Sequence, residues 1–123
     1  MTDPKIAAVH AYVAAFAAGD AAAAAALFAE DATLEDPVGG EALHGKPEIA
    51  AFYQHAMQMG ARLALTGPVR VAGNAAAFAF TVRVAAASPG GMEIDVIEVF
   101  RFDVAGLGAS MQAFWGPANV RMG

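Results

Sequence analysis

Residues 95–102 read Asp95-Val96-Ile97-Glu98-Val99-Phe100-Arg101-Phe102, a pattern that predicts a β-strand. Side chains alternate between the two faces of a strand. One face of this strand would therefore carry Val96, Glu98, Phe100 and Phe102. That face is apolar except for Glu98. A carboxyl shielded from water resists ionisation, so its pKa rises, and in its neutral form it can donate a hydrogen bond.

Two other interpretations of Glu98 are open at this point. The carboxyl could be paired with a buried arginine. Alternatively, a shift of the strand register by one residue would turn it to solvent.

Patterns of period two on both sides of this stretch predict further strands. The predicted strands cover residues 32–36, 62–65, 69–72, 75–87, 92–103 and 109–115. Ser88-Pro89-Gly90-Gly91 is predicted to form the hairpin turn between the two longest of them.

The N-terminal half of the chain has helical spacing and helix-start signals. Asp3 is the expected N-cap of a first helix with Pro4 at its first position, and Gly19 ends it. The first predicted helix covers residues 4–18, and a third covers residues 47–59. Between them, Asp20 is expected to cap a second helix that runs to about residue 28. Helices followed by an antiparallel meander predict an α+β domain, with the helices packed on one face of the sheet.

Composition narrows the class of protein. The chain has 123 residues, of which 58% are hydrophobic, so we expect a single domain over residues 1–123 with a sizeable core. The net charge is -5 with only 7 Lys plus Arg, which argues against nucleic acid or an anionic membrane as a partner. Cysteine is absent from the sequence, which fits a cytoplasmic protein.

The N-terminal residues do not resemble a signal peptide, and the longest alanine tract, residues 21–26, is too short to span a bilayer. His10, His44 and His55 are scattered, so neither a metal site nor a metal cofactor is expected. No glycine-rich phosphate loop follows a strand and opens a helix, and nothing resembles a nucleophile elbow.

Asp36 and Tyr12 are the other candidate functional residues. Strand parity turns Asp36 to the same face as Leu34, at a strand end before Pro37, although a turn-forming Asp is the commoner role at such a position. Tyr12 lies on the apolar face of the first helix and could simply be a core tyrosine. Tyr53 has the same two interpretations.

Together these residues suggest a carboxylate base, a tyrosine and a carboxylic acid in an apolar chamber. At this point the chain resembles the bacterial steroid Δ5-isomerase (ketosteroid isomerase) family, within the NTF2-like, SnoaL-like superfamily. The resemblance covers nearly the whole chain. It is carried by the residues Ala18-Gly19-Asp20, Glu35-Asp36-Pro37-Val38-Gly39, Ala77-Phe78-Ala79-Phe80-Thr81-Val82, Phe100-Arg101-Phe102 and Phe114-Trp115-Gly116.

The resemblance implies roles for particular residues. Tyr12 matches the tyrosine of the family's oxyanion hole, and Asp36 matches the general base. Glu98 stands where the family has an Asp as second oxyanion donor, a departure by one methylene. Phe28 matches a position where some members have a further tyrosine, whereas Tyr53 is still able to donate to Tyr12.

The implied fold is an NTF2-like cone, with three N-terminal helices on a strongly curved, mostly antiparallel sheet that encloses an apolar pocket. The implied activity is conversion of 3-oxo-Δ5-steroids to 3-oxo-Δ4-steroids without a cofactor, with a small hydrophobic steroid-like substrate and a homodimer formed through the sheet. The walls of the pocket, or the core next to them, would be Phe52, Tyr53, Phe80, Val82, Val96, Phe100, Met111 and Trp115.

Two alternatives remain beside the isomerase. One is another SnoaL-like enzyme, such as a polyketide cyclase or an epoxide hydrolase, which could also use an inward Asp. The other is a non-catalytic steroid or lipid carrier on the same fold, which would need the pocket but not three converging polar groups.

Overall fold

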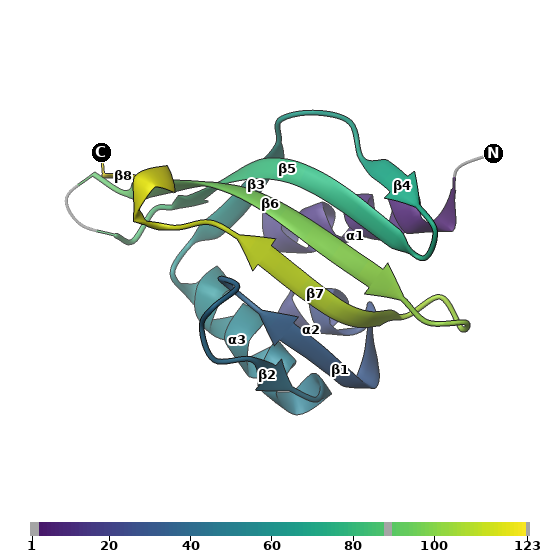
Figure 1. Cartoon of the computed structure of the whole chain (residues 1–123). Coiled ribbons are helices and arrows are strands. Elements are labelled where there is room, and N and C mark those ends of the chain that lie inside the picture. The colour runs from purple at the N-terminus through teal and green to yellow at the C-terminus, as the bar shows by residue number, and fades with distance from the viewer. Residues whose placement is uncertain (1–2, 88–89, 123) are drawn as a thin grey trace.

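The computed structural model describes residues 3–87 and 90–122 and has helices packed against one face of a curved sheet (Figure 1). The helices are α1 (Pro4–Ala18), α2 (Ala21–Ala25) and α3 (Lys46–Gln58), with a short 3-10 helix at Pro117–Asn119. The strands are β1 (Phe28–Glu35), β2 (Leu43–His44), β3 (Ala61–Leu65), β4 (Arg70–Ala72), β5 (Ala75–Val84), β6 (Met92–Phe102), β7 (Gly108–Phe114) and β8 (Val120–Met122).

The sheet is mixed and does not close into a barrel. Its strand order is β2-β1-β7-β6-β5-β3, while β4 pairs with β5 and β8 pairs with β6. Among the strands that the structure describes, β1 and β7 form the one parallel pair and every other pair is antiparallel. The expected α+β class with a mostly antiparallel sheet is confirmed. Helix α3 follows β1 in the chain, in agreement with the predicted strand at residues 32–36 and helix at residues 47–59.

The predicted helix signals act as expected. The Asp3 side chain accepts a hydrogen bond from the backbone N–H of Lys5 at 2.8 Å, and Gly19 ends α1 with φ of 66°. Asp20 then accepts from the N–H of Ala23 at 3.0 Å. These caps satisfy backbone groups that the first and last turns of a helix leave without partners.

The predicted extent of the second helix was wrong. Helix α2 ends at Ala25, and Phe28 begins the strand β1, which is longer than the predicted segment 32–36. Phe28 is fully buried, with its ring 5.1 Å from that of Phe100, so packing against the sheet overrides local helix propensity there. Strand β5 ends at Val84 rather than at residue 87.

Two strands, β2 and β8, were not predicted; each has three residues or fewer. The predicted turn at Ser88-Pro89 lies outside the described residues. Among the residues that are described, no helix is both long and apolar enough to cross a membrane.

The core lies between the concave face of the sheet and the helices. Helix α1 contributes Val9, Tyr12 and Phe16 to it, while α3 contributes Ile49, Tyr53 and Met57. Facing them, the sheet contributes buried side chains that include Phe78, Phe80, Val96, Glu98, Phe100 and Met111. Among the buried residues that the structure describes, Glu98 is the one with an ionisable carboxyl, amine or guanidinium side chain.

Candidate active site

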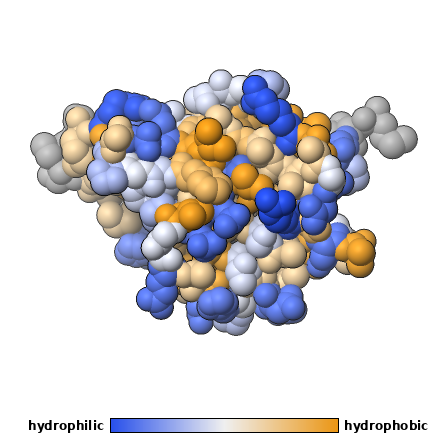
Figure 2. All heavy atoms as spheres, in the orientation of Figure 1, coloured by the Kyte–Doolittle hydropathy of each residue, from blue (hydrophilic) through white to orange (hydrophobic). Residues whose placement is uncertain are grey.

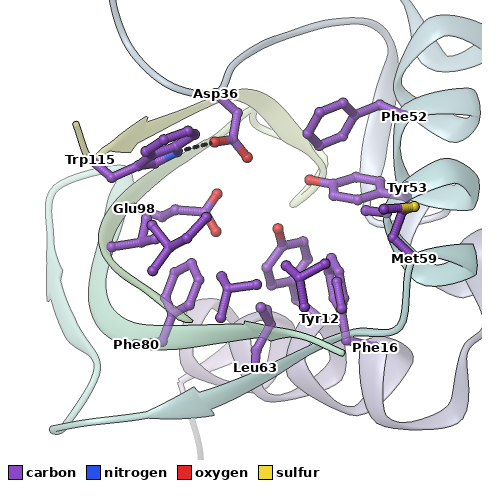
Figure 3. Close-up of a pocket in the computed structure, with 16 residues that line it drawn as sticks. Tyr12, Phe16, Asp36, Phe52, Tyr53, Met59, Leu63, Phe80, Glu98 and Trp115 are labelled. Carbon is purple, nitrogen blue, oxygen red and sulfur yellow. Dashed lines mark hydrogen bonds between the residues drawn. The ribbon is translucent and has the colours of Figure 1, made fainter. Parts of the chain in front are cut away.

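A cavity of about 230 Å³ lies inside the curve of the sheet, between the strands and helices α1 and α3 (Figure 3). It is mostly apolar, with a few polar groups, as is typical of small-molecule sites. The residues that line it are Tyr12, Phe16, Asp36, Phe52, Tyr53, Ala56, Met59, Ala61, Leu63, Phe80, Val82, Val84, Ile94, Val96, Glu98 and Trp115.

Glu98 lies on the inner face of β6, as strand parity predicted. It pairs with Phe78 of β5 on one side and with Ala113 of β7 on the other, so the alternative register does not occur. The residue is 1% exposed, and its Oε2 is the one buried side-chain nitrogen or oxygen of the described residues that has no hydrogen-bond partner. The carboxyl is therefore free to bind a ligand.

Burial is also the main cause of the altered acidity of Glu98. Desolvation and then the charge of Asp36 raise its pKa well above the ordinary 4.5, while the nearby Tyr12 hydroxyl acts in the opposite direction. A carboxyl in this environment favours its neutral form, which has an O–H to donate.

Tyr12 of α1 and Tyr53 of α3 meet edge to face, with ring centroids 5.6 Å apart. Desolvation, followed by the charge of Glu98, raises the pKa of each phenol well above the ordinary 10.0. Both hydroxyls therefore stay protonated and can donate a hydrogen bond. The Tyr53 hydroxyl donates to Sδ of Met111 over 3.4 Å, an acceptor that competes with the donation to Tyr12 expected from the sequence.

Asp36 follows the last residue of β1 and points into the cavity. Its neighbour Glu35 points the other way and accepts a hydrogen bond from Gln112 at 2.9 Å, which agrees with the predicted parity. The Nε1 of Trp115 donates to Oδ1 of Asp36 at 2.6 Å, a contact that sequence reasoning missed. Desolvation raises the pKa of Asp36 above the ordinary 3.8, and the hydrogen bond from Trp115 partly counteracts this.

The three polar groups come from separate elements but face one another. Figure 3 shows the carboxyls of Asp36 and Glu98 and the hydroxyl of Tyr12 directed into the same space. Chemically, such a site offers one carboxylate base beside two hydrogen-bond donors. Within residues 3–87 and 90–122, no three His, Cys, Asp or Glu side chains lie close enough together to hold a metal ion.

Six of the eight residues predicted for the pocket or the core next to it do line the cavity, namely Phe52, Tyr53, Phe80, Val82, Val96 and Trp115. Phe100 and Met111 are fully buried in the core outside the cavity lining. The Phe100 ring leans over Gly108 and packs 4.5 Å from the ring of Phe102. It lies on the same strand face as Glu98, but it packs in the core beside Tyr12, at a centroid distance of 6.4 Å, and not in the cavity wall.

Sequence reasoning did not single out the lining residues Phe16, Ala56, Met59, Ala61, Leu63, Val84 and Ile94. Strand parity could have found two of them. Val84 shares a strand face with Phe80 and Val82, and Ile94 shares one with Val96 and Glu98. Nothing in the sequence near Met59 marks it as a wall residue, because its position depends on how α3 meets the sheet.

The fold and this site define the class of protein. The family model of the SnoaL-like domain matches residues 9–111, and the chain therefore belongs to the SnoaL-like family of NTF2-like proteins. Among curated proteins it is similar to a steroid Delta-isomerase of Nocardioides simplex, with 41% identity over 114 residues that cover 93% of this chain and 91% of the relative. The resemblance noted from the sequence motifs is thereby confirmed.

A comparison with solved structures supports the fold independently. The chain is similar to SalBIII, an epoxide hydrolase/cyclase-like enzyme with a role in pyran ring formation in the polyether salinomycin. The TM-score is 0.86 and the identity is 23%. The match covers 94% of this chain and 93% of the other. Both of these similar proteins are enzymes, but at this identity the second comparison concerns the fold alone.

Proposed function

We propose that this protein is a steroid Δ5-isomerase, which converts 3-oxo-Δ5-steroids to 3-oxo-Δ4-steroids. The observation that carries the proposal is the convergence of Asp36, Tyr12 and Glu98 in one buried, mostly apolar cavity. The 41% identity to a steroid Delta-isomerase supports it. A carrier would need only the apolar cavity, whereas this site adds a base and two donors.

The reaction begins with proton transfer from carbon. The substrate would enter with its C3 carbonyl toward Tyr12 and Glu98, and Asp36 would remove a proton from C4. The electron pair of the broken C4–H bond forms the C3=C4 double bond, and the carbonyl oxygen becomes a dienolate oxygen. Asp36, now protonated, returns the proton to C6, where the C5=C6 electron pair forms the new C–H bond. The C3=C4 double bond then shifts to C4=C5 and the C3 carbonyl is restored. The transfer is intramolecular overall and consumes nothing else.

The dienolate oxygen would be stabilised by two donors that are already in place. The Tyr12 hydroxyl and the neutral Glu98 carboxyl both have raised pKa values because they are desolvated. Donors directed at a charge that develops in the transition state, in a site that excludes water, are typically worth about 3 to 4 kcal/mol each. Ketosteroid isomerase is the established example of this use of a protonated acid.

The apolar walls suit a rigid polycyclic substrate. Phe80, Val82 and Val96 present flat or branched apolar surface from neighbouring strands, and Phe52 faces them from α3. Burying the rings here would exclude water from the proton transfer.

The decisive experiment compares the parent protein with Asp36→Asn. With 5-androstene-3,17-dione as substrate, we expect appearance of the conjugated enone absorbance to fall by orders of magnitude in the variant, because an amide cannot accept the proton. Steroid binding should survive, and quenching of the single Trp, Trp115 in the cavity wall, measures it. Unchanged turnover would contradict the role of Asp36.

Glu35→Gln is the matched control. Glu35 is the adjacent carboxylate, it lies on the opposite strand face and it binds Gln112, so its loss should leave turnover near the parent value. A parent protein that binds the steroid tightly without converting it would favour the carrier.

We also propose that the protein forms a homodimer through the sheet face that lies away from the helices. Ile97 and Phe114 are register partners on that face and are 53% and 45% exposed. Figure 2 shows hydrophobic side chains gathered over the middle of this face. Exposed Arg101 flanks them on β6, as does Asp95, which is already paired with Arg121, so a twofold-related copy could cover the apolar centre and leave these charges at its edge.

Light scattering tests the dimer directly. We expect a dimeric mass for the parent and a monomeric mass for Ile97→Glu, because a carboxylate at the centre of the interface would be desolvated. A monomeric parent, or a variant that stays dimeric, would contradict this interface.

A further inference from the structure

The cavity is polar at one end and apolar at the other. The reason is the register of β5 and β6, which places facing pairs of side chains one after another along the cavity wall. Going away from Glu98, the facing pairs on β5 and β6 are Phe78–Glu98, Phe80–Val96, Val82–Ile94 and Val84–Met92. At about 3.3 Å per residue, Ile94 lies roughly 13 Å along the strand from Glu98. The third strand of the wall, β3, continues the ladder, since its Leu63 pairs with Val82 and its Ala61 pairs with Val84.

Met59 lies at the far end of this ladder. It precedes Ala61 by two residues, lines the cavity and, at 37%, is the most exposed residue that does so. In Figure 3 it lies on the opposite side of the chamber from Glu98 and Trp115. Met59 therefore belongs to the rim, where the cavity meets solvent.

The backbone of Met59 is fixed while its side chain is not enclosed. Its N–H donates to the carbonyl of His55 at 3.0 Å, and its carbonyl accepts from the N–H of Ala86 at 3.1 Å. These bonds tie the end of α3 to the segment that follows β5. Methionine is unbranched and adapts to irregular apolar surfaces, so the side chain can follow the shape of a ligand.

A steroid whose C3 carbonyl is bound by Glu98 would reach this rim. The cavity volume of about 230 Å³ is smaller than the roughly 300 to 1,000 Å³ typical of ligand pockets, so a steroid would fill the cavity up to its rim and hold its remote end against the lining there. The lining there consists of Ala61, Val84, Ile94 and Met59, none of which has a side chain that donates a hydrogen bond. A polar group held against this surface would lose water without gaining a partner.

We propose that Met59 is a specificity-determining residue that contacts the end of the steroid remote from the reacting carbonyl and favours an alkyl substituent over an oxygenated one. The inference rests on the proposed isomerase function and adds the substrate preference of the same cavity. Its contact is equal in the bound substrate and in the transition state, so it acts on KM and leaves kcat nearly unchanged.

The test uses two steroids that differ only at the remote end. 5-Pregnen-3-one carries an ethyl group there and 5-pregnene-3,20-dione carries an acetyl group. We expect the parent to have the higher kcat/KM for the ethyl compound. Met59→Gln, which is similar in length but polar, should reduce this preference by on the order of tenfold, mainly through KM. Met59→Leu should keep the preference, because it keeps an apolar rim.

Met122→Gln is the matched control, because Met122 is 56% exposed and does not line the cavity. If Met59→Gln left the ratio of the two kcat/KM values at the parent value, or if the control changed it equally, the assignment to Met59 would be overturned. If the parent converted neither steroid, the isomerase function itself would fail. In that case the dissociation constants of the two steroids, measured by Trp115 fluorescence, test the Met59 contact instead. Met59→Gln should then reduce the preference in binding for the ethyl compound by on the order of tenfold, and an unchanged ratio of the two constants would overturn the contact.

Discussion

Trp115 holds Asp36 by a hydrogen bond of 2.6 Å from the indole Nε1 to Oδ1. The two residues meet because β1 and β7 run parallel with Glu35 opposite Gln112. Asp36 and Trp115 each directly follow the last residue of their strand, and both lie at the same end of the cavity. Burial raises the pKa of Asp36, and the indole N–H lowers it by stabilising the carboxylate. Trp115 thus orients the proposed base and counteracts part of the effect of burial on its pKa.

Trp115→Phe should therefore shift the pH profile of the reaction. Without the indole N–H the pKa of Asp36 rises further, so the base becomes protonated at a higher pH. We expect the acid limb of kcat/KM against pH, measured with 5-androstene-3,17-dione, to move toward higher pH. Phe52→Leu changes a different wall residue that has no hydrogen bond to Asp36, and it should leave the limb where it is. An unmoved limb in Trp115→Phe would mean that the indole does not set this pKa.

Replacement of Glu98 separates its donor function from its volume. Glu98→Ala removes the donor, and we expect kcat to fall by about 100- to 1,000-fold. Glu98→Gln keeps an N–H donor of similar size but lower acidity, so its loss should be smaller. Single-turnover rates of steroid conversion measure both. Equal activity of the parent and both variants would exclude Glu98 from the oxyanion hole.

Much of the site could be predicted because strand parity is a local property. Alternation alone turned Glu98 inward on its strand and separated Asp36 from Glu35, and the structure agrees on both. The helix caps at Asp3 and Asp20 were equally readable, since each bond joins residues two or three positions apart.

The rest depends on contacts between distant parts of the chain. The parallel pairing of β1 with β7 joins segments more than seventy residues apart, as the bond between Trp115 and Asp36 (79 positions) illustrates. Phe28 was assigned to a helix because its burial against Phe100 cannot be read from its neighbours. Met59 was missed because an exposed methionine becomes a wall residue only through the angle between α3 and β3.

Glu98 also links the stability of the protein to pH. Its pKa in the folded state lies well above the ordinary 4.5, so folding favours the neutral carboxyl. The contribution of Glu98 to the free energy of unfolding is fully present below the pKa that Glu98 has in the unfolded chain. It is lost as pH rises through the pKa that Glu98 has in the folded protein.

Glu98→Gln has no ionisable group here, so its free energy of unfolding should rise relative to the parent above about pH 4.5. The difference should grow by up to about 1.4 kcal/mol per pH unit until the folded pKa is passed. Urea unfolding at a series of pH values measures the difference. Parallel curves for the two proteins would show that the pKa of Glu98 is not raised.

Gly108 is required by the packing of Phe100. A Cβ at this position would fall far inside van der Waals contact with Cε1 of the Phe100 ring, and that ring is enclosed by Phe28 at 5.1 Å and Phe102 at 4.5 Å. The ring has no free space into which to move, so Gly108→Ala should destabilise the fold by about 1 to 3 kcal/mol.

The midpoint of urea unfolding measures this loss, and Gly116→Ala is the control. No atom lies within 4 Å of a Cβ built at Gly116, and its φ of -147° is extended backbone that alanine adopts readily. We expect the control to unfold near the parent midpoint, whereas Gly108→Ala unfolds at clearly lower urea. Equal midpoints for the two variants would mean that the Phe100 ring can move aside. The packing of Phe28, Phe100 and Phe102 would then be less tight than their ring distances indicate.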